Sequence, residues 1–183
     1  MISLVRELVL RLLATLGLYN KKGTLVLLGL DNAGKSTLLH RLTSGEVTSL
    51  PPTERPNMEQ FQLGGITFKA WDLGGHEAVR HLWGDFMGDS QAVVFMVDAA
   101  DSERLEEAHW ELCELMTEGP HADVPVAVLY NKCDLPSALS DRQLHGQADW
   151  HRFQDRRPVR AFRTSVLQGT GYEEAFQWLG QFL

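Results

Sequence analysis

The sequence predicts an α/β domain built on a mostly parallel sheet with helices on both faces. Short apolar runs alternate with amphipathic stretches of helical period, a pattern typical of strands joined by crossover helices. The runs 92–97 and 125–130 are apolar without alternation, as expected of strands buried on both faces. One pair of strands differs, because the Gly64-Gly65 pair between the runs 59–63 and 66–72 predicts a tight antiparallel hairpin.

The composition fits one domain with a full core. The chain has 183 residues, of which 44% are hydrophobic and 22% are charged. Cys113 and Cys133 have no paired spacing, so we expect neither a disulfide framework nor a zinc site, and we expect a reducing compartment. The net charge is -7, but residues 1–22 carry a net +3, which leaves -10 for the remainder. The acidic body argues against a nucleic-acid partner, whereas the basic N-terminal end suits an anionic surface.

Residues 1–18 predict an amphipathic helix outside the main core. Its charges argue against a membrane-spanning helix, and Ile2 stands where N-myristoylation requires glycine. Membrane contact would therefore be made by the side chains of the helix itself. A helix packed permanently on the domain explains the same pattern equally well, so the amphipathicity leaves both alternatives open. The apolar face consists of Ile2, Val5, Leu8, Val9, Leu12, Leu13 and Leu16.

A phosphate-binding loop is predicted at 29–36, between the apolar run 24–28 and a helix over 35–44 that Gly45 ends. The loop reads Gly-Leu-Asp-Asn-Ala-Gly-Lys-Ser. Its backbone N–H groups and the helix N-terminus would surround a polyphosphate, which Lys35 would also contact, and Ser36 would offer its hydroxyl to Mg²⁺. An ordinary glycine-containing turn is the alternative. The predicted nucleotide contacts here are Asp31, Asn32, Ala33, Gly34, Lys35, Ser36 and Thr37.

Further along the chain, four residues are candidates for a site around the Mg²⁺ and the terminal phosphate. Thr53 lies in an irregular, proline-containing stretch, and Asp72 ends a strand, where a parallel sheet gathers its ligands. Gly75 would bring a backbone N–H to the phosphate, and His76 would orient an attacking water. Taken singly, Thr53 would be an ordinary loop threonine and His76 an exposed loop histidine.

A purine-recognition site is predicted after the run 125–130. The carboxylate of Asp134 can accept hydrogen bonds from the N1–H and the exocyclic amine of guanine, a donor pair that adenine lacks. Lys132 can cover the base with its aliphatic stem, and Asn131 can tie neighbouring loops together. After the last predicted strand, 159–163, the backbone N–H groups of Ser165 and Val166 could also contact the base.

Three further helices are predicted, from residue 101 or 102 to about 119, from Ser140 toward Trp150, and over 173–183. We interpret the acidic face of the first helix as solvated and assign it no function. We interpret the arginines over 152–163 as a solvated basic patch, and His40 and His109 as surface or packed residues. The acidic face consists of Glu103, Glu106, Glu107, Glu111, Glu114 and Glu118.

In order and spacing, these motifs resemble the five-motif series of small GTPases. The loop 29–36 and the N-terminal helix are similar to the Arf/Sar branch. The chain resembles the Sar subfamily most closely, for three reasons. His76 stands where Arf proteins usually have glutamine, and Ile2 stands where they have an acceptor glycine. The segment 72–83 and the C-terminal motifs over 165–178 are also similar to those of Sar proteins. The segment 54–60 and the absence of aromatic residues from the N-terminal helix depart from the Sar pattern.

The resemblance implies a P-loop small GTPase fold with a six-stranded sheet that contains one antiparallel strand. It implies a membrane-switch helix over 1–20 and a GTP-binding domain over 21–183. GTP or GDP would be the bound nucleotide, hydrolysis would be slow without a GTPase-activating coat component, and an exchange factor would reload the site. The GDP form would be cytosolic. The GTP form would insert residues 1–18 into the endoplasmic-reticulum membrane and recruit the COP-II coat, so the protein would lie on the cytoplasmic face of the endoplasmic reticulum and Golgi.

Three alternatives to a Sar-type protein remain open. The first is an Arf-like trafficking GTPase with another effector, and the second is a relative that binds nucleotide without hydrolysing it. The third is a P-loop phosphotransferase, which would share the loop 29–36 but would have no use for the motif 131–134.

Overall fold

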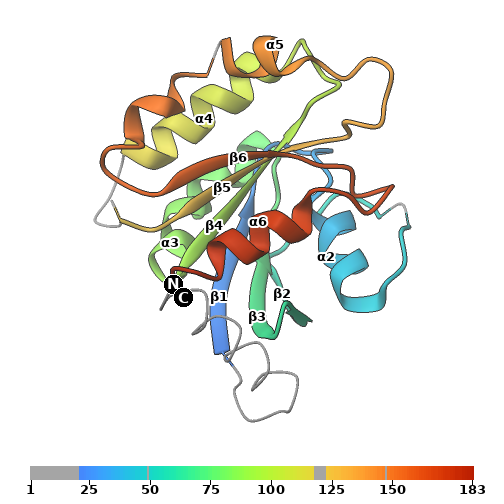
Figure 1. Ribbon diagram of the computed structural model, residues 1–183, viewed down its shortest axis with the longest axis vertical. Coiled ribbons are helices and arrows are strands. Elements are labelled where there is room, and N and C mark those ends of the chain that lie inside the picture. Colours follow the sequence, from blue (N-terminus) through green and yellow to red (C-terminus); the bar gives the residue numbers. More distant parts are fainter. Residues whose placement is uncertain (1–20, 49, 118–122, 147) are drawn as a thin grey trace, which may run out of the picture.

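The computed structural model describes residues 21–48, 50–117, 123–146 and 148–183, so the predicted N-terminal helix lies outside the described residues. Six strands form one sheet in the order β2-β3-β1-β4-β5-β6 (Figure 1). All neighbouring strands are parallel except the pair β2 and β3, which confirms the predicted sheet. The strands are β1 (Lys21–Leu28), β2 (Asn57–Leu63), β3 (Ile66–Asp72), β4 (Ala92–Asp98), β5 (Val126–Asn131) and β6 (Val159–Arg163).

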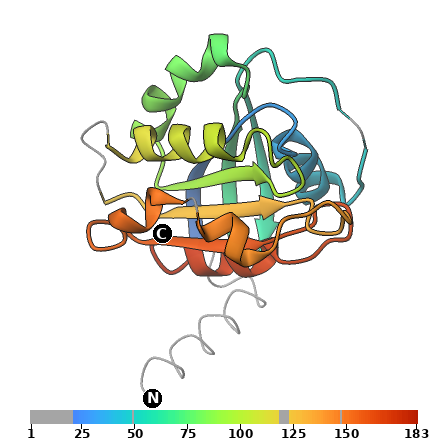
Figure 2. The same ribbon diagram turned by 90° about the horizontal axis from the view of Figure 1, so that it is seen from above.

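Helices cover both faces of this sheet (Figures 1 and 2). The side chains of β4 alternate between two apolar clusters: Val93, Phe95 and Val97 join one cluster, and Ala92, Val94 and Met96 join the other. On the first face lie α3 (Trp83–Gly88), α4 (Leu105–Thr117), α5 (Asp141–Gly146) and the 3-10 helix η2 (Asp149–Phe153). On the second face lie α2 (Lys35–Ser44) and α6 (Tyr172–Leu179).

The β2–β3 hairpin turns at Gly64 and Gly65, as the sequence predicts. Both glycines have positive φ, 59° and 78°, which suits the tight turn that matches the twist of antiparallel strands. β2 begins at Asn57, two residues before the predicted start, and pairs with the end of β3 at Asp72. Phe61 stacks on Phe68, and both rings meet the ring of Phe176 of α6 edge-on.

Several helix boundaries differ from the expected ones. The helix expected from residue 101 or 102 begins at Leu105, and the one expected to run from Ser140 toward Trp150 ends at Gly146 and is followed by η2. Glycine is a poor helix former, which explains the break. α6 ends at Leu179, and the chain continues in tight turns to the C-terminus. The 3-10 helix η1 (Glu77–Leu82) and α3 were not expected.

One surface assignment made from the sequence is wrong in part, and that of His109 as a surface or packed residue is confirmed. Arg157 belongs to the expected solvated basic patch but is only 3% exposed, whereas Arg163 of the same patch is exposed and pairs with Asp141 at 2.8 Å. His109 is buried and its Nε2 lies 3.0 Å from the hydroxyl of Tyr130, so it is a packed residue. Within the described part of the chain, no helix is long and apolar enough to cross a bilayer.

Candidate functional site

The loop between β1 and α2 is built around a buried lysine. Lys35 Nζ donates hydrogen bonds to the carbonyl oxygens of Gly29 and Leu30, both at 2.8 Å, and the residue is 6% exposed. Burial lowers the pKa of Lys35 to about 8, an effect that the nearby Asp72 carboxylate partly offsets. The charged form of this ammonium would be favoured by an anionic ligand in the loop.

The backbone of this loop is shaped for close approach. Gly29 has a φ of 127°, and a Cβ there would lie 2.1 Å from the carbonyl oxygen of Met96, so only glycine fits. Asn32 also has positive φ, 62°. Lys35, Ser36 and Thr37 form the first turn of α2, where helix geometry leaves N–H groups without intrahelical partners. This is the arrangement that binds phosphate groups at helix N-termini.

Three oxygen-bearing side chains from separate segments converge beside this loop. Ser36 Oγ lies 2.6 Å from both Asp72 Oδ2 and Thr53 Oγ1, and Thr53 Oγ1 donates to the same carboxylate oxygen at 3.1 Å. Asp72 is 3% exposed, and burial raises the pKa of its carboxyl group, although the two hydroxyl donors act against that rise. Its second oxygen, Oδ1, is buried without a hydrogen-bond partner among the described residues.

This donor set fits Mg²⁺. Mg²⁺ prefers oxygen ligands and is commonly held by one or two carboxylates together with the phosphates of a substrate. The orphaned Asp72 Oδ1 is a buried oxygen that a metal-bound water could reach, and the two hydroxyls supply neutral oxygens. Groups of three or more His, Cys, Asp or Glu side chains suited to a metal do not occur in the described ranges, so a site with a single carboxylate is the one that the residues offer.

The segment after β3 lies directly on the phosphate-binding loop. A Cβ added to Gly75 would lie 2.2 Å from the backbone nitrogen of Asp31, and one added to Gly74 would lie 2.7 Å from the carbonyl oxygen of Thr53. Gly75 therefore lies against the phosphate-binding loop and Gly74 lies against Thr53, which contacts the loop through Ser36. His76 follows Gly75 in the sequence, but its imidazole is exposed and is engaged elsewhere. The ring caps η1 by accepting a hydrogen bond from the backbone N–H of Ala78 at 3.4 Å.

Arg80 fixes this segment to α4, a role that the sequence did not indicate. Its Nε donates to the carbonyl oxygen of Gly75 at 2.9 Å, and its two terminal nitrogens pair with Glu107 at 2.8 Å and Glu111 at 2.6 Å. The Arg80 side chain is only 9% exposed. The interpretation of the α4 glutamates as solvated surface is therefore wrong for Glu107 and Glu111. The four-residue spacing of Glu107 and Glu111 predicts that they share one helix face, but the neighbouring sequence does not predict which distant arginine they bind.

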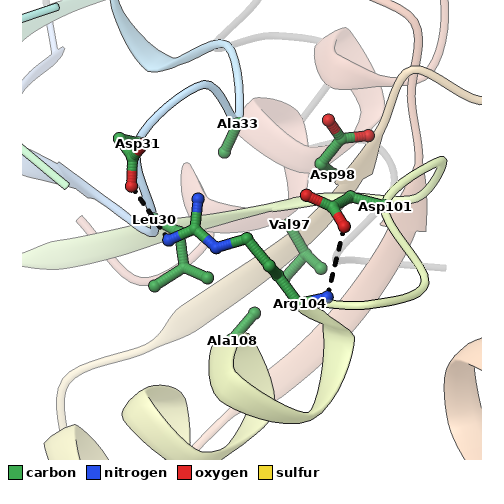
Figure 3. Close-up of a pocket in the computed structure, with 8 residues that line it drawn as sticks. All are labelled: Leu30, Asp31, Ala33, Val97, Asp98, Asp101, Arg104 and Ala108. Atoms are coloured by element: carbon green, nitrogen blue, oxygen red, sulfur yellow. Dashed lines mark hydrogen bonds and ion pairs between the residues drawn. The ribbon is translucent and has the colours of Figure 1, made fainter. Parts of the chain in front are cut away.

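A second arginine joins α4 to the phosphate-binding loop. Arg104 pairs with Asp31 at 2.9 Å and with Glu107 at 2.9 Å, and its hydrogen bonds lower the pKa of both carboxyl groups. Figure 3 shows its side chain reaching across a small pocket toward Asp31, while its backbone N–H is bonded to Asp101. The pocket is lined by Leu30, Asp31, Ala33, Val97, Asp98, Asp101, Arg104 and Ala108.

The segment after β5 meets the turn after β6, as predicted. Asn131 donates from Nδ2 to the carbonyl oxygen of Ala33 at 2.9 Å and accepts at Oδ1 from the Val166 N–H at 3.0 Å. The ammonium of Lys132 pairs with Asp98 at 2.6 Å, and Asp134 Oδ1 accepts from Ser165 Oγ at 2.5 Å. The candidate base-recognition residues are thus brought to one edge of the sheet.

The backbone donors of that turn are arranged differently from our expectation. The Ser165 N–H donates to the carbonyl oxygen of Thr170 at 3.0 Å, and the Val166 N–H is held by Asn131. The next N–H, that of Leu167, makes no hydrogen bond to any residue that the structure describes. Leu167 N–H is therefore the donor of this turn that remains for a base.

Comparison with known proteins places this geometry in context. The model of the ADP-ribosylation factor family matches residues 9–183. The chain is 40% identical over 181 residues to the small COPII coat GTPase SAR1 of Giardia intestinalis, covering 93% of this chain and 95% of that protein. It is 36% identical to ADP-ribosylation factor-like protein 3 of Chlamydomonas reinhardtii, covering 89% and 93%. A solved structure of the Arl6 (BBS3) small GTPase of Trypanosoma brucei, with the bound nucleotide analogue GppNp, superposes with a TM-score of 0.78 at 29% identity, covering 88% of this chain and 96% of that one.

Proposed function

This chain belongs to the ADP-ribosylation factor family and is a small GTPase that binds GTP and GDP and hydrolyses GTP, and on that premise we propose that it is a Sar-type switch. Its GTP form would insert an amphipathic helix into the endoplasmic-reticulum membrane and recruit a vesicle coat. The name and the 40% identity of the Giardia relative support this assignment, as do His76 and Ile2. An Arf-like trafficking GTPase with another effector is the remaining alternative.

The observation that carries the proposal is the convergence of Ser36, Thr53 and Asp72 beside the phosphate-binding loop. Thr53 comes from the segment after α2 and Gly75 from the segment after β3, and both touch the loop. A terminal phosphate seated there would hold both segments, and its loss would release them. The same three side chains would hold Mg²⁺, which when bound neutralises charge on the phosphates.

The remaining site residues have assigned tasks in this proposal. Backbone N–H groups of 31–37 and of Gly75 would bind the phosphates together with Lys35, and Asp134 would accept from guanine while Lys132 covers the base. Asn131 and Ser165 hold these loops together, and Val166 belongs to the same turn. His76 would turn its imidazole away from η1 to orient the attacking water.

Slow intrinsic hydrolysis follows from the state of the two arginines that contact the site. Arg80 and Arg104 touch Gly75 and Asp31, but both are held in ion pairs by glutamates of α4. Neither guanidinium is therefore available to stabilise charge on a transferring phosphoryl group, and an activating partner would supply the missing arginine. The proposed partners are this coat component and an exchange factor.

Residues 1–20 would form the membrane switch, and 21–183 would form the GTP-binding domain. The β2–β3 hairpin joins the two segments that would sense the phosphate, so a shift of its register would transmit the nucleotide state. Such a shift must move the strand by an even number of residues, because side chains alternate between the faces of a sheet. The GDP form would then be cytosolic, and the GTP form would lie on the cytoplasmic face of the endoplasmic reticulum or the Golgi.

Liposome flotation tests the membrane switch. Binding should be stronger with a non-hydrolysable GTP analogue than with GDP, and Leu12→Glu on the apolar face of residues 1–18 should abolish the difference. Thr15→Glu on the polar face is the matched control and should retain it. Equal flotation in both nucleotide states would refute the switch, and capture of a different coat by the GTP form would favour the Arf-like alternative.

Single-turnover hydrolysis tests the role of His76. The His76→Gly variant should lose most of the rate that an activating partner stimulates, because the water would no longer be oriented. An unchanged stimulated rate would remove His76 from the mechanism.

A further inference from the structure

Arg41, in the last turn of α2, holds the turn that follows β6. Its Nη1 donates to the carbonyl oxygens of Val166 at 2.9 Å and Leu167 at 3.1 Å, and its Nε donates to the hydroxyl of Tyr172 at 2.9 Å. Tyr172 is the first residue of α6. One guanidinium therefore joins the helix of the phosphate-binding loop to both ends of a turn that lies more than 120 residues away in sequence.

The guanidinium is seated closely against the turn. Gly169 has a φ of 78°, and a Cβ there would lie 2.4 Å from Arg41 Nη2. The turn is otherwise closed on itself, because Ser165 and Thr170 exchange two backbone hydrogen bonds at 3.0 Å. The carbonyl oxygens of Val166 and Leu167 both accept hydrogen bonds from Arg41, so this side chain restrains their orientation.

The orientation of one peptide group follows from these contacts. The peptide bond between Val166 and Leu167 is trans and planar, so its carbonyl oxygen and its N–H point in opposite directions. Arg41 holds the oxygen on the α2 side, and the Leu167 N–H is thereby directed away from α2. A charged donor on the oxygen also polarises the peptide group and strengthens its N–H as a donor.

We propose that Arg41 is a positioning residue for recognition of the 6-oxo group of guanine, acting through the Leu167 N–H. The inference rests on the proposed base site, since Ser165 ties the same turn to Asp134. In this arrangement Asp134 reads the N1–H and the amine of the base, and the turn held by Arg41 reads the oxygen. Because Lys35 and Ser36 lie on the same helix as Arg41, α2 carries contacts to the phosphates at one end and support for base recognition at the other.

Binding of three nucleotides distinguishes a role of Arg41 in recognising the 6-oxo group from a general role in stabilising the fold. GDP has the 6-oxo group, the N1–H and the exocyclic amine. Inosine diphosphate keeps the oxo group and the N1–H and lacks the amine, and 2-aminopurine riboside diphosphate keeps the amine and lacks both the oxo group and the N1–H. For Arg41→Met we expect the affinity for GDP and for inosine diphosphate to fall about tenfold, the usual effect of losing a well-placed hydrogen bond. The affinity for the 2-aminopurine nucleotide should change less than about twofold.

Companion variants keep the test decisive. Arg142→Met removes an exposed arginine from α5 and should leave all three affinities unchanged. Arg41→Lys can still donate to one carbonyl and should recover part of the loss. Tyr172→Phe removes only the partner of Arg41 Nε and should give the same selective pattern at smaller size, so it serves if Arg41→Met does not fold.

The outcomes are distinct. Equal loss for all three nucleotides, or no loss for GDP, would overturn the role of Arg41. A wild-type protein that binds GDP no better than the 2-aminopurine nucleotide would instead refute the proposed base site, before any variant is measured.

Discussion

Replacing Asn131 with alanine tests whether one buried amide holds the phosphate-binding loop to the turn that follows β6. Asn131 is 3% exposed and bonds the Ala33 carbonyl oxygen at 2.9 Å and the Val166 N–H at 3.0 Å. Ala33 and Val166 are themselves 1% and 3% exposed, so alanine would leave two backbone groups buried without partners. Each such group costs about 1–3 kcal/mol. We expect the free energy of unfolding to fall by about 2–6 kcal/mol and Tm by roughly 5–20 °C.

Urea and thermal unfolding of the nucleotide-free protein measure this loss without a contribution from ligand binding. Asn131→Asp keeps an acceptor for the Val166 N–H but sets a second carboxylate oxygen against the Ala33 carbonyl oxygen, so it should be at least as destabilising. Asn57→Ala is the matched control, because Asn57 is exposed and its side chain bonds only Glu59 among the described residues, at 3.1 Å; its cost should stay below about 0.5 kcal/mol. If Asn131→Ala proves no more harmful than this control, the two loops are held together by other contacts and the reasoning is wrong.

Three further predictions concern the nucleotide site. Asp72→Asn should release a fluorescent GDP analogue at a rate that the wild-type protein reaches only when EDTA removes Mg²⁺, and release that still responds to EDTA would contradict the metal assignment. Because burial lowers the pKa of Lys35 to about 8 and phosphates favour its charged form, nucleotide affinity should fall as the pH rises through about 8, by at most about tenfold per pH unit. Calorimetry in buffers of different ionisation enthalpy should then detect proton uptake on binding, and none above that pH would exclude this coupling. Arg80→Met removes the hydrogen bond to the Gly75 carbonyl oxygen, so it should weaken binding of a GTP analogue more than binding of GDP. It should also alter the fluorescence emission of Trp83, whose Nε1 donates to the Gly74 carbonyl oxygen at 3.0 Å. Equal weakening of GTP-analogue and GDP binding would mean that Arg80 does not act through Gly75.

Much of the architecture could be predicted because the signals that define it are local. The apolar run of β4 and the Gly64-Gly65 turn each report the needs of a few adjacent residues, namely burial on both faces and positive φ. Ser36 and Asp72 are expected to lie close together because each follows or ends a parallel strand, and such strands end at one edge of a sheet; the structure brings them together with Thr53, the candidate from an irregular segment. The boundaries of α4 and α6 and the presence of η1 and α3 were less accessible, since short helices depend on packing.

The sequence by itself determined the order of the strands and of most helices along the chain, the hairpin, and the predicted position of the phosphate-binding loop, because periodicity and glycine stereochemistry act over a few residues. Only the tertiary structure decided which charged side chains are partners. Glu107 and Glu111 bind Arg80 while Glu106 of the same helix is exposed, and Arg41 reaches carbonyl oxygens 125 and 126 residues away. These pairings depend on the angle and position at which each helix packs on the sheet, and on which side chains that packing buries. Both are properties of the whole folded domain, so a short stretch of sequence does not predict them.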